Sequence, residues 1–221
     1  MTWLRHWRFV LQTSVTAVIY VGLFACTNVA VRSRAPATGQ VWFGWASTNL
    51  VNLRHHPVGA MVVSALMDDS NILDWIALGL IGLICAGHTL GNMRCAIVVT
   101  VAHVLGTLVS EGILAVRTAA GAMPVTDRSI LDIGPSYVIV AALVVGIAYG
   151  RWPARVASAI AFALLAPHLF VGLTHLDVGA IGHCCAIVIG LALGFVFQRS
   201  WRTRVESATA GLSAVGSSLR A

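Results

Sequence analysis

Long apolar runs limit what this chain can fold into more than any other feature of its sequence. Hydrophobic residues make up 58% of its 221 residues and charged residues only 10%, whereas about 25% of the residues in a typical soluble domain are charged. A soluble fold could not bury this much apolar surface. The longest runs approach the ~20 residues that a helix needs to cross the hydrocarbon core of a bilayer. The sequence therefore predicts an all-α membrane protein.

Six apolar runs are separated by glycine and proline, and each run is expected to form one transmembrane helix. The first run follows Arg5 and Arg8 and could instead be the core of a signal peptide, but it is longer than the ~7–15 residues usual there. A brief apolar stretch at residues 58–67 is too short to span alone. The predicted spans lie at about residues 9–31, 72–87, 95–116, 131–149, 154–173 and 178–198, in one membrane domain at residues 1–198, and a cytoplasmic tail follows at residues 199–221.

The placement of arginine predicts how the chain is oriented. All fourteen basic residues are arginine and the net charge is +6. Such a charge could indicate a nucleic-acid partner, but the arginines stand singly at the ends of apolar runs, which is typical of membrane helices. An even number of spans puts both termini on one side, and nine of the fourteen arginines fall there. Because the arginine-rich side is cytoplasmic, both termini are expected inside. The single arginines at the ends of apolar runs also mean that no nucleic acid is expected to bind.

One serine and one histidine are the best candidates for chemistry within the membrane. Ser136 lies about five residues into the fourth predicted span and His183 about five residues into the sixth, and both spans run from outside to inside. At ~1.5 Å per residue the two side chains would lie at matching depth, ~7–8 Å below the outer helix ends. They could then meet as a nucleophile and its general base. Alternatively, the serine bonds a backbone carbonyl and the histidine makes an ordinary polar contact between helices.

The residues around this pair resemble a known family. Gly134-Pro135-Ser136 begins the fourth run, and Gly182-His183-Cys184-Cys185-Ala186 in the sixth run is followed by Gly190 and Gly194. These motifs are similar to those of the rhomboid intramembrane serine proteases and their bacterial rhomboid-like relatives, over about residues 9–198. The resemblance implies a six-helix rhomboid-like bundle in a bacterial cytoplasmic membrane. It also implies Ser136 as nucleophile, His183 as base, and close helix packing at Gly134, Gly190 and Gly194.

Two departures from the family pattern bear on activity. The family's Gly-x-Ser-Gly motif ends in glycine, whereas Tyr137 stands here. Active rhomboids also carry a His-x-x-x-Asn pair at the outer start of the second helix, which helps to hold the oxyanion. At that place only Asn71 offers a neutral side-chain donor, among the acids Asp68, Asp69 and Asp74. Loss of one oxyanion donor can lower a rate by about 100- to 1,000-fold.

Acidic residues near the pair could support it. Asp132 lies one helical turn before Ser136, and Asp177 could lie near His183 at the same opening. Either could orient His183 as the third member of a triad, although helix capping is the simpler interpretation. On the third run, His103 and Glu111 are eight residues apart, near one face, and could pair with each other.

No metal, organic cofactor or disulfide is expected. The five cysteines lie mostly in or beside apolar runs and lack the paired spacing of a zinc site. The adjacent side chains of His183, Cys184 and Cys185 would point apart on a helix.

Three functions remain open at this stage, so the sequence does not decide whether the chain is an enzyme. The first is an intramembrane serine protease that cleaves membrane-anchored proteins near the outer face through the Ser136–His183 dyad. The second is an inactive rhomboid-like pseudoprotease that binds, chaperones or assembles partner membrane proteins, which Tyr137 favours. The third, a small transporter or channel, ranks last because the polar residues gather toward one side of the bilayer and do not form a path across it.

Overall fold

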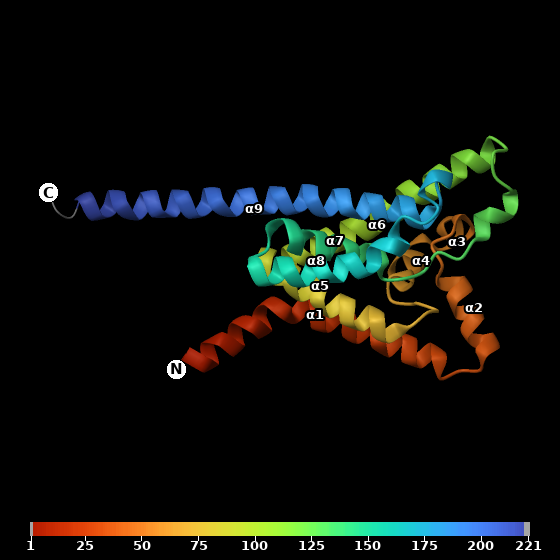
Figure 1. Cartoon of the computed structure of the whole chain (residues 1–221), viewed down its shortest axis with the longest axis horizontal. Coiled ribbons are helices and arrows are strands. Elements are labelled where there is room, and N and C mark those ends of the chain that lie inside the picture. The colour runs from red at the N-terminus through yellow and green to blue at the C-terminus, as the bar shows by residue number, and fades with distance from the viewer. Residues whose placement is uncertain (1, 219–221) are drawn as a thin grey trace.

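The structure is a computed structural model that describes the backbone of residues 2–218 and the side chains of residues 14–200. Over these residues the chain is helical and contains no strand. The bundle consists of α1 (Thr2–Arg32), α5 (Ile72–Leu90), α6 (Asn92–Ala119), α7 (Ser136–Tyr149), α8 (Trp152–Leu169) and α9 (Val178–Ser218) (Figure 1). Three short helices, α2 (Pro36–Ala46), α3 (Leu50–His55) and α4 (Pro57–Ser64), link α1 to α5, and two 3-10 turns, η1 (Val125–Ser129) and η2 (Leu173–His175), lie in later loops. The predicted all-α architecture is confirmed.

Each of the six apolar runs corresponds to one helix of the bundle. Four helical segments are long and apolar enough to cross a membrane, at Ser14–Arg32, Ile72–Leu90, Asn92–Ala119 and Val178–Ser200. The other two are exceptional: α7 is apolar but has only 14 residues, and α8 has 18 residues with Pro167 inside it. The chain is therefore an integral membrane protein.

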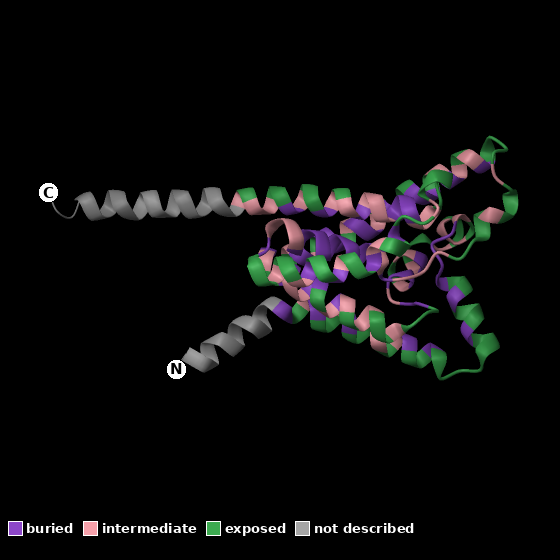
Figure 2. Ribbon diagram, in the orientation of Figure 1, coloured by how far each residue is buried: buried purple, intermediate pink, exposed green. Residues whose placement is uncertain are grey.

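Helix α7 is the centre of the bundle. All ten residues from Tyr137 to Gly146 are buried, and Figure 2 shows this buried segment enclosed by the surrounding helices. A helix that is apolar on every side is buried either in a protein core or in lipid, and here neighbouring helices bury it. Its length of about 21 Å is less than the ~30 Å of a hydrocarbon core, which is tolerable because other helices and not lipid surround it.

Helix α7 begins at Ser136, later than the expected start at residue 131. Gly134 has φ +134°, a conformation that is open to glycine and strained for other residues. Pro135 is the residue before the first helical turn. The backbone N–H of Gly134 donates to the Ser64 carbonyl at the end of α4 (2.9 Å). Ser136 is consequently the first residue of the helix and not the sixth.

Helix α1 holds the segment between α4 and α5 in place. The buried Asn28 side chain donates to the Leu66 carbonyl (3.0 Å) and accepts from the Asp68 backbone N–H (3.0 Å). The Tyr20 hydroxyl donates to the Ala65 carbonyl (2.5 Å). Because Ser64 in turn binds the backbone at Gly134, α1 indirectly positions the start of α7.

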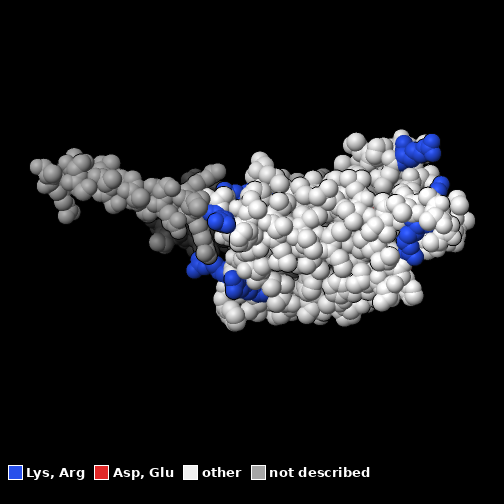
Figure 3. All heavy atoms as spheres, turned by 90° about the horizontal axis from the view of Figure 1, so that it is seen from above, with Lys and Arg blue, Asp and Glu red and all other residues white. Residues whose placement is uncertain are grey.

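The two ends of the bundle differ in their connections. At one end, tight turns at Gly91 and at Gly150–Arg151 join α5 to α6 and α7 to α8. Longer loops with η1 and η2 lie at the other end, beside α2 to α4 (Figure 1). Figure 3 shows, on the face that it draws, arginines gathered at both ends with an uncharged belt between them. This distribution is typical of a surface that contacts lipid.

Candidate functional site

Ser136 lies where three segments that are far apart in the sequence meet. It begins α7, directly after the extended segment that contacts α4. A small cavity of ≈ 10 Å³ adjoins it, which is about the room that one water molecule needs. The cavity is lined by Thr48, Ser64, His103, Asp132, Ile133, Gly134, Ser136 and Tyr137.

The start of α7 presents unsatisfied backbone donors. No side chain caps this helix, and its first intrahelical bond runs from the Ile139 N–H to the Pro135 carbonyl (3.0 Å). The N–H groups of the first turn therefore have no partner within the helix, and they form the positive end of its dipole. A negative charge that develops beside Ser136 would be stabilised there.

His183 is held in one tautomer near the start of α9. Its Nδ1 lies 2.8 Å from the carbonyl oxygen of Leu169, and a carbonyl can only accept a hydrogen bond, so Nδ1 carries the hydrogen. In the neutral ring, Nε2 then bears the lone pair. Nε2 is buried and has no hydrogen-bond partner among the described residues. This is the arrangement that a general base requires: one nitrogen is oriented by a donor bond and the other is available for a proton.

Tyr137 separates two histidines. Its ring centroid lies 5.3 Å from that of His183, with the planes at 82°, and 6.1 Å from that of His103. Its hydroxyl donates to the Val178 carbonyl (3.3 Å). A Cβ on Gly182 would overlap the tyrosine ring, so this large side chain fits only because glycine faces it.

Ser136 and His183 are not joined by a hydrogen bond in the described part of the chain. His183 Nδ1 is bonded to Leu169, and Nε2 has no partner. Tyr137, the residue after the serine, contacts the imidazole instead. His183 therefore has the tautomer that the predicted dyad requires. The Tyr137 ring lies beside it.

A second serine and histidine lie close together, and sequence reasoning did not anticipate this. Ser64 Oγ lies 3.4 Å from Nε2 of the buried His103. The same nitrogen lies 2.8 Å from the Met61 carbonyl and therefore carries a hydrogen. Nε2 cannot then accept the serine proton, and this pair is not a nucleophile and base. No spacing rule predicts it, because the two residues are 39 positions apart.

The pairing of His103 with Glu111 that their spacing allows does not form among the described residues. His103 Nδ1 and Glu111 Oε2 are both buried and lack hydrogen-bond partners among the described residues. Both side chains face the interior from α6. They are polar atoms in an apolar environment, which is costly unless water reaches them.

Asp132 ties the segment before α7 to the loop between α2 and α3. Its Oδ2 accepts from the Thr48 hydroxyl (2.8 Å), its carbonyl accepts from the Thr48 N–H (2.9 Å), and its own N–H donates to Ser47 Oγ (2.9 Å). Burial raises the pKa of the Asp132 carboxyl, and the hydrogen bond from Thr48 partly opposes this rise. The carboxylate makes no hydrogen bond to His183 in the described structure.

The two other candidate support residues have local partners. Asn71 is exposed and caps α5: its Oδ1 accepts from the Leu73 N–H (3.2 Å), and its amide donates to Asp74 (2.9 Å). Asp177 is exposed just before α9, and its carbonyl accepts from the Ile181 N–H (3.1 Å). Neither side chain lines the cavity beside Ser136.

Three glycines proposed for close packing have different surroundings. A Cβ on Gly190 would lie 2.9 Å from the Ala141 carbonyl oxygen, and one on Gly194 would lie 2.5 Å from the Tyr149 ring, so α9 approaches α7 closely at both positions. Gly134 precedes the helix, and its added Cβ would lie 3.3 Å from Asp68 Oδ2. An acidic side chain therefore lies near the start of α7. Among the described side chains, no three His, Cys, Asp or Glu residues converge as metal ligands would.

Comparison with known proteins agrees with this architecture. The family model for rhomboid-like protein matches residues 8–202. No curated protein and no solved structure matches the chain. The matched region runs from within α1 to within α9, takes in α5 to α8 entirely, and covers well over half of the sequence. The chain therefore belongs to the family of rhomboid-like proteins.

Proposed function

We propose that this chain is an intramembrane serine protease that cleaves membrane-anchored proteins near the outer face of a bacterial cytoplasmic membrane. In this proposal α1 and α5 to α9 cross the membrane in six passes, with both termini in the cytoplasm. Ser136 is the nucleophile and His183 the general base. The single observation that carries the proposal is the hydrogen bond from His183 Nδ1 to the Leu169 carbonyl (2.8 Å), because it leaves Nε2 as the proton acceptor.

The proposed reaction needs only groups of this chain and water. Ser136 Oγ attacks the scissile carbonyl carbon while its proton passes to His183 Nε2. The protonated imidazole then gives that proton to the departing amine, and an acyl-serine remains. Water, deprotonated by His183, hydrolyses the ester and restores the serine. The first-turn N–H groups of α7 support the oxyanion, because no side chain occupies them.

Substrate binding has to bring the two side chains together. Catalytic hydrogen bonds are often long or unformed without substrate and tighten in the complex. Here the Tyr137 ring has to shift relative to His183, or Ser136 has to reach past it. The proposal therefore predicts that the serine reacts slowly in the absence of a bound substrate helix.

A second candidate, a rhomboid-like pseudoprotease, is favoured by the Tyr137–His183 contact. A ring 5.3 Å from the imidazole centroid occupies space that a serine, a water and a scissile bond would share. Asn71 is exposed and already caps α5, so the amide that the sequence offered for the oxyanion is not positioned for it. In this alternative the fold binds transmembrane helices of partner proteins without cutting them.

Labelling with a fluorophosphonate distinguishes the two functions. The purified full-length chain, in detergent and in proteoliposomes, is treated with the probe alongside Ser136→Ala, His183→Ala and Ser64→Ala. Ser64→Ala is the matched control, because this serine also lies beside a histidine but faces a protonated nitrogen. The protease predicts labelling of wild type and Ser64→Ala, with loss in the other two variants. Absence of Ser136-dependent labelling, together with no cleavage of a model transmembrane substrate, would rule out the protease and leave the pseudoprotease.

A further inference from the structure

One side of α6 carries a row of buried polar side chains. His103, Thr107 and Glu111 follow one another at intervals of four residues, so they lie along one side of the helix over about 12 Å. Their exposed fractions are 6%, 0% and 2%. We call these three residues the α6 polar row. Polar side chains inside a membrane bundle are costly and commonly mark a function.

Each member of the α6 polar row has a polar atom without a hydrogen-bond partner among the described residues. These atoms are His103 Nδ1, Thr107 Oγ1 and Glu111 Oε2. Because His103 Nε2 carries the hydrogen that is donated to Met61, Nδ1 of the neutral ring can accept a hydrogen bond. An unpaired polar group in an apolar interior lowers the free energy of unfolding. Three such groups in one row therefore favour a bound molecule that pairs with them.

The row begins at the cavity beside Ser136. His103 lines this cavity together with Asp132 and Ser136, and its volume of ≈ 10 Å³ is about the room that one water molecule needs. An ordered internal water makes about three hydrogen bonds. These three side chains supply that number of polar partners.

The other end of the row lies beside the start of α9. A Cβ on Gly106 would lie 3.3 Å from the Gly182 carbonyl oxygen, and Arg117 donates to the His175 carbonyl (2.6 Å). The two helices therefore run in opposite directions. Glu111 lies between these two contacts on α6, so it is level with the first turn of α9 and close to the loop that contains η2.

The Tyr137 side chain lies beside the row. Its ring centroid is 6.1 Å from that of His103, and its hydroxyl is close enough to Ser110 and Glu111 to interact with them electrostatically. Glu111 interacts in the same way with the Asp132 carboxyl, which lines the cavity. One aromatic side chain thus adjoins both ends of the row.

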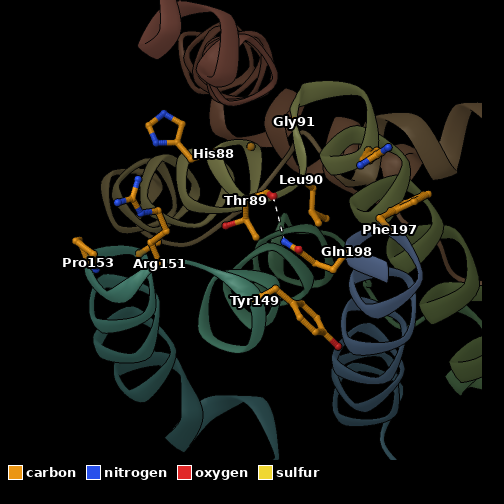
Figure 4. Close-up of a pocket in the computed structure, with 12 residues that line it drawn as sticks. His88, Thr89, Leu90, Gly91, Tyr149, Arg151, Pro153, Phe197 and Gln198 are labelled. Atoms are coloured by element: carbon orange, nitrogen blue, oxygen red, sulfur yellow. Dashed lines mark hydrogen bonds between the residues drawn. The ribbon is translucent and has the colours of Figure 1, made fainter. Parts of the chain in front are cut away.

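The α6 polar row is distinct from a larger cavity at the other end of α7. That cavity has a volume of ≈ 760 Å³ and lies where α5 is followed by α6 and α7 by α8 (Figure 4). The Gln198 amide there donates to the Thr89 carbonyl (3.3 Å), as the dashed line in Figure 4 shows. This amide has a protein partner, unlike the buried atoms of the row.

We propose that the α6 polar row binds a chain of internal water molecules, which joins the cavity beside Ser136 to Glu111 at the start of α9. Each unpaired atom of the row bonds to one of these waters. The chain passes beside Tyr137 and places water next to Ser136, where ester hydrolysis consumes it. This use of the water rests on the proposed function, whereas the binding of water does not.

Radiolytic footprinting of the full-length chain in detergent tests for the water. Short X-ray pulses produce hydroxyl radicals from bound water, and these radicals oxidise the side chains that the water contacts. Tyr137 is only 4% exposed but is expected to be oxidised, because it adjoins the chain of waters. Phe24, a fully buried aromatic residue in the apolar core, is the dry control and is expected to be oxidised severalfold more slowly.

Thr107→Val interrupts the chain with little change of shape. Oxidation of Tyr137 is expected to fall severalfold in this variant, and also in Glu111→Leu, which serves if Thr107→Val does not fold. Thr118→Val is the matched control on the same helix, because the Thr118 hydroxyl already donates to the Leu114 carbonyl (2.5 Å). This control is expected to leave the oxidation of Tyr137 unchanged.

The direction of the stability change is a second readout. Removal of a hydroxyl that bonds to water loses a hydrogen bond, so the unfolding temperature of Thr107→Val is expected to fall by about 2–4 °C. Removal of a hydroxyl that has no partner at all would raise it instead. Glu111→Leu is expected to change in the same direction as Thr107→Val.

Oxidation of Tyr137 that depends on Thr107, with a lower unfolding temperature in Thr107→Val, supports the proposal. Oxidation of Tyr137 as slow as that of Phe24, or higher unfolding temperatures in Thr107→Val and Glu111→Leu, would show that the row is dry and overturn it. Oxidation of Tyr137 that is equal in wild type and Thr107→Val would confine water to the cavity beside Ser136 and overturn the chain. None of these readouts requires cleavage, so a failure of the protease proposal is distinguishable from a failure of this one.

Discussion

The Tyr137 ring stands edge-on to the imidazole of His183, with the centroids 5.3 Å apart and the planes at 82°. The tyrosine follows the candidate nucleophile in the chain and touches the candidate base in space. It also lies over Gly182, the residue before that histidine, and against Gly106 of α6. Two glycines thus make room for one aromatic ring. This packing makes Tyr137 a component of the helix interface and the obvious residue with which to test activity.

Replacement of Tyr137 by glycine restores the family's motif and is expected to increase the reactivity of Ser136. If the ring obstructs approach to His183, fluorophosphonate labelling should accelerate by about tenfold, which corresponds to ~1.4 kcal/mol of barrier. Removal of a buried aromatic side chain should also lower the free energy of unfolding by about 3–5 kcal/mol. Labelling rates and thermal unfolding in detergent measure both effects.

Tyr149→Ala is the matched control for the tyrosine experiment. This residue also presents a ring from α7 to a glycine of α9, at the far end of the helix. The variant should lose stability without a change in labelling rate. An unchanged rate in Tyr137→Gly would show that the ring does not limit access to the base.

Gly182→Ala is expected to destabilise the fold through a collision with Tyr137. The new Cβ would overlap the tyrosine ring, and overpacking of this kind lowers the free energy of unfolding by about 1–3 kcal/mol. The thermal unfolding temperature in detergent should fall, and the double variant Tyr137→Ala/Gly182→Ala should be less sensitive to the added methyl group. Gly179→Ala, where nothing lies within 4 Å of the added Cβ, should leave stability nearly unchanged. An equal fall in both single variants would contradict the assignment.

The sequence was sufficient for the six helices of the bundle, but not for the short helices α2 and α3 or for the contacts between elements. Six apolar runs predicted six helices, because the length and hydropathy of a run determine whether it can form a helix in lipid. The start of α7 was placed five residues early, although Gly134-Pro135 was a visible signal for a break. Hydropathy outweighed that signal in the prediction, since the residues on both sides of it are apolar.

The surroundings of the site could not be read from the sequence. The bonds from Ser47 and Thr48 to the segment before α7 connect residues 83 to 85 positions apart. The tautomer of His183 depends on the backbone carbonyl of Leu169 in α8. Every residue has a backbone carbonyl, so the sequence does not indicate which one lies beside the histidine. Motif resemblance identified Ser136 and His183 as candidates. It could not indicate that Tyr137 would lie against the histidine.

Asp132→Asn is expected to change how stability depends on pH. Burial raises the pKa of this carboxyl above its ordinary value of 3.8, so the folded state holds the proton more tightly than the unfolded state does. The resulting stabilisation is fully present below pH 3.8 and is lost as pH rises through the higher folded pKa. Asparagine can still accept from Thr48 but does not titrate. The variant should therefore show a smaller decline in unfolding temperature as pH rises from acidic to neutral.

Asp127→Asn provides the control for this titration. Asp127 lies in the 3-10 turn η1, and its replacement removes one carboxyl group without altering the contact between Asp132 and Thr48. Thr48→Val should steepen the decline, because it removes the hydrogen bond that opposes the pKa rise of Asp132. If Asp132→Asn and wild type lose stability in parallel over this range, the pKa of Asp132 is not raised.

Gly134→Ala is expected to disturb the start of α7 and with it the position of Ser136. Alanine is strained at φ +134°, at about 1–3 kcal/mol for a sparsely populated backbone conformation, and its Cβ would meet Asp68 Oδ2 at 3.3 Å. The unfolding temperature should fall, and any Ser136-dependent labelling should fall further than the loss of folded protein explains, because the hydroxyl is displaced. Gly112→Ala in α6 is the matched control, since nothing lies within 4 Å of its added Cβ and alanine favours a helix. Normal stability and labelling in Gly134→Ala would show that the turn before α7 tolerates another backbone conformation and does not set the position of the serine.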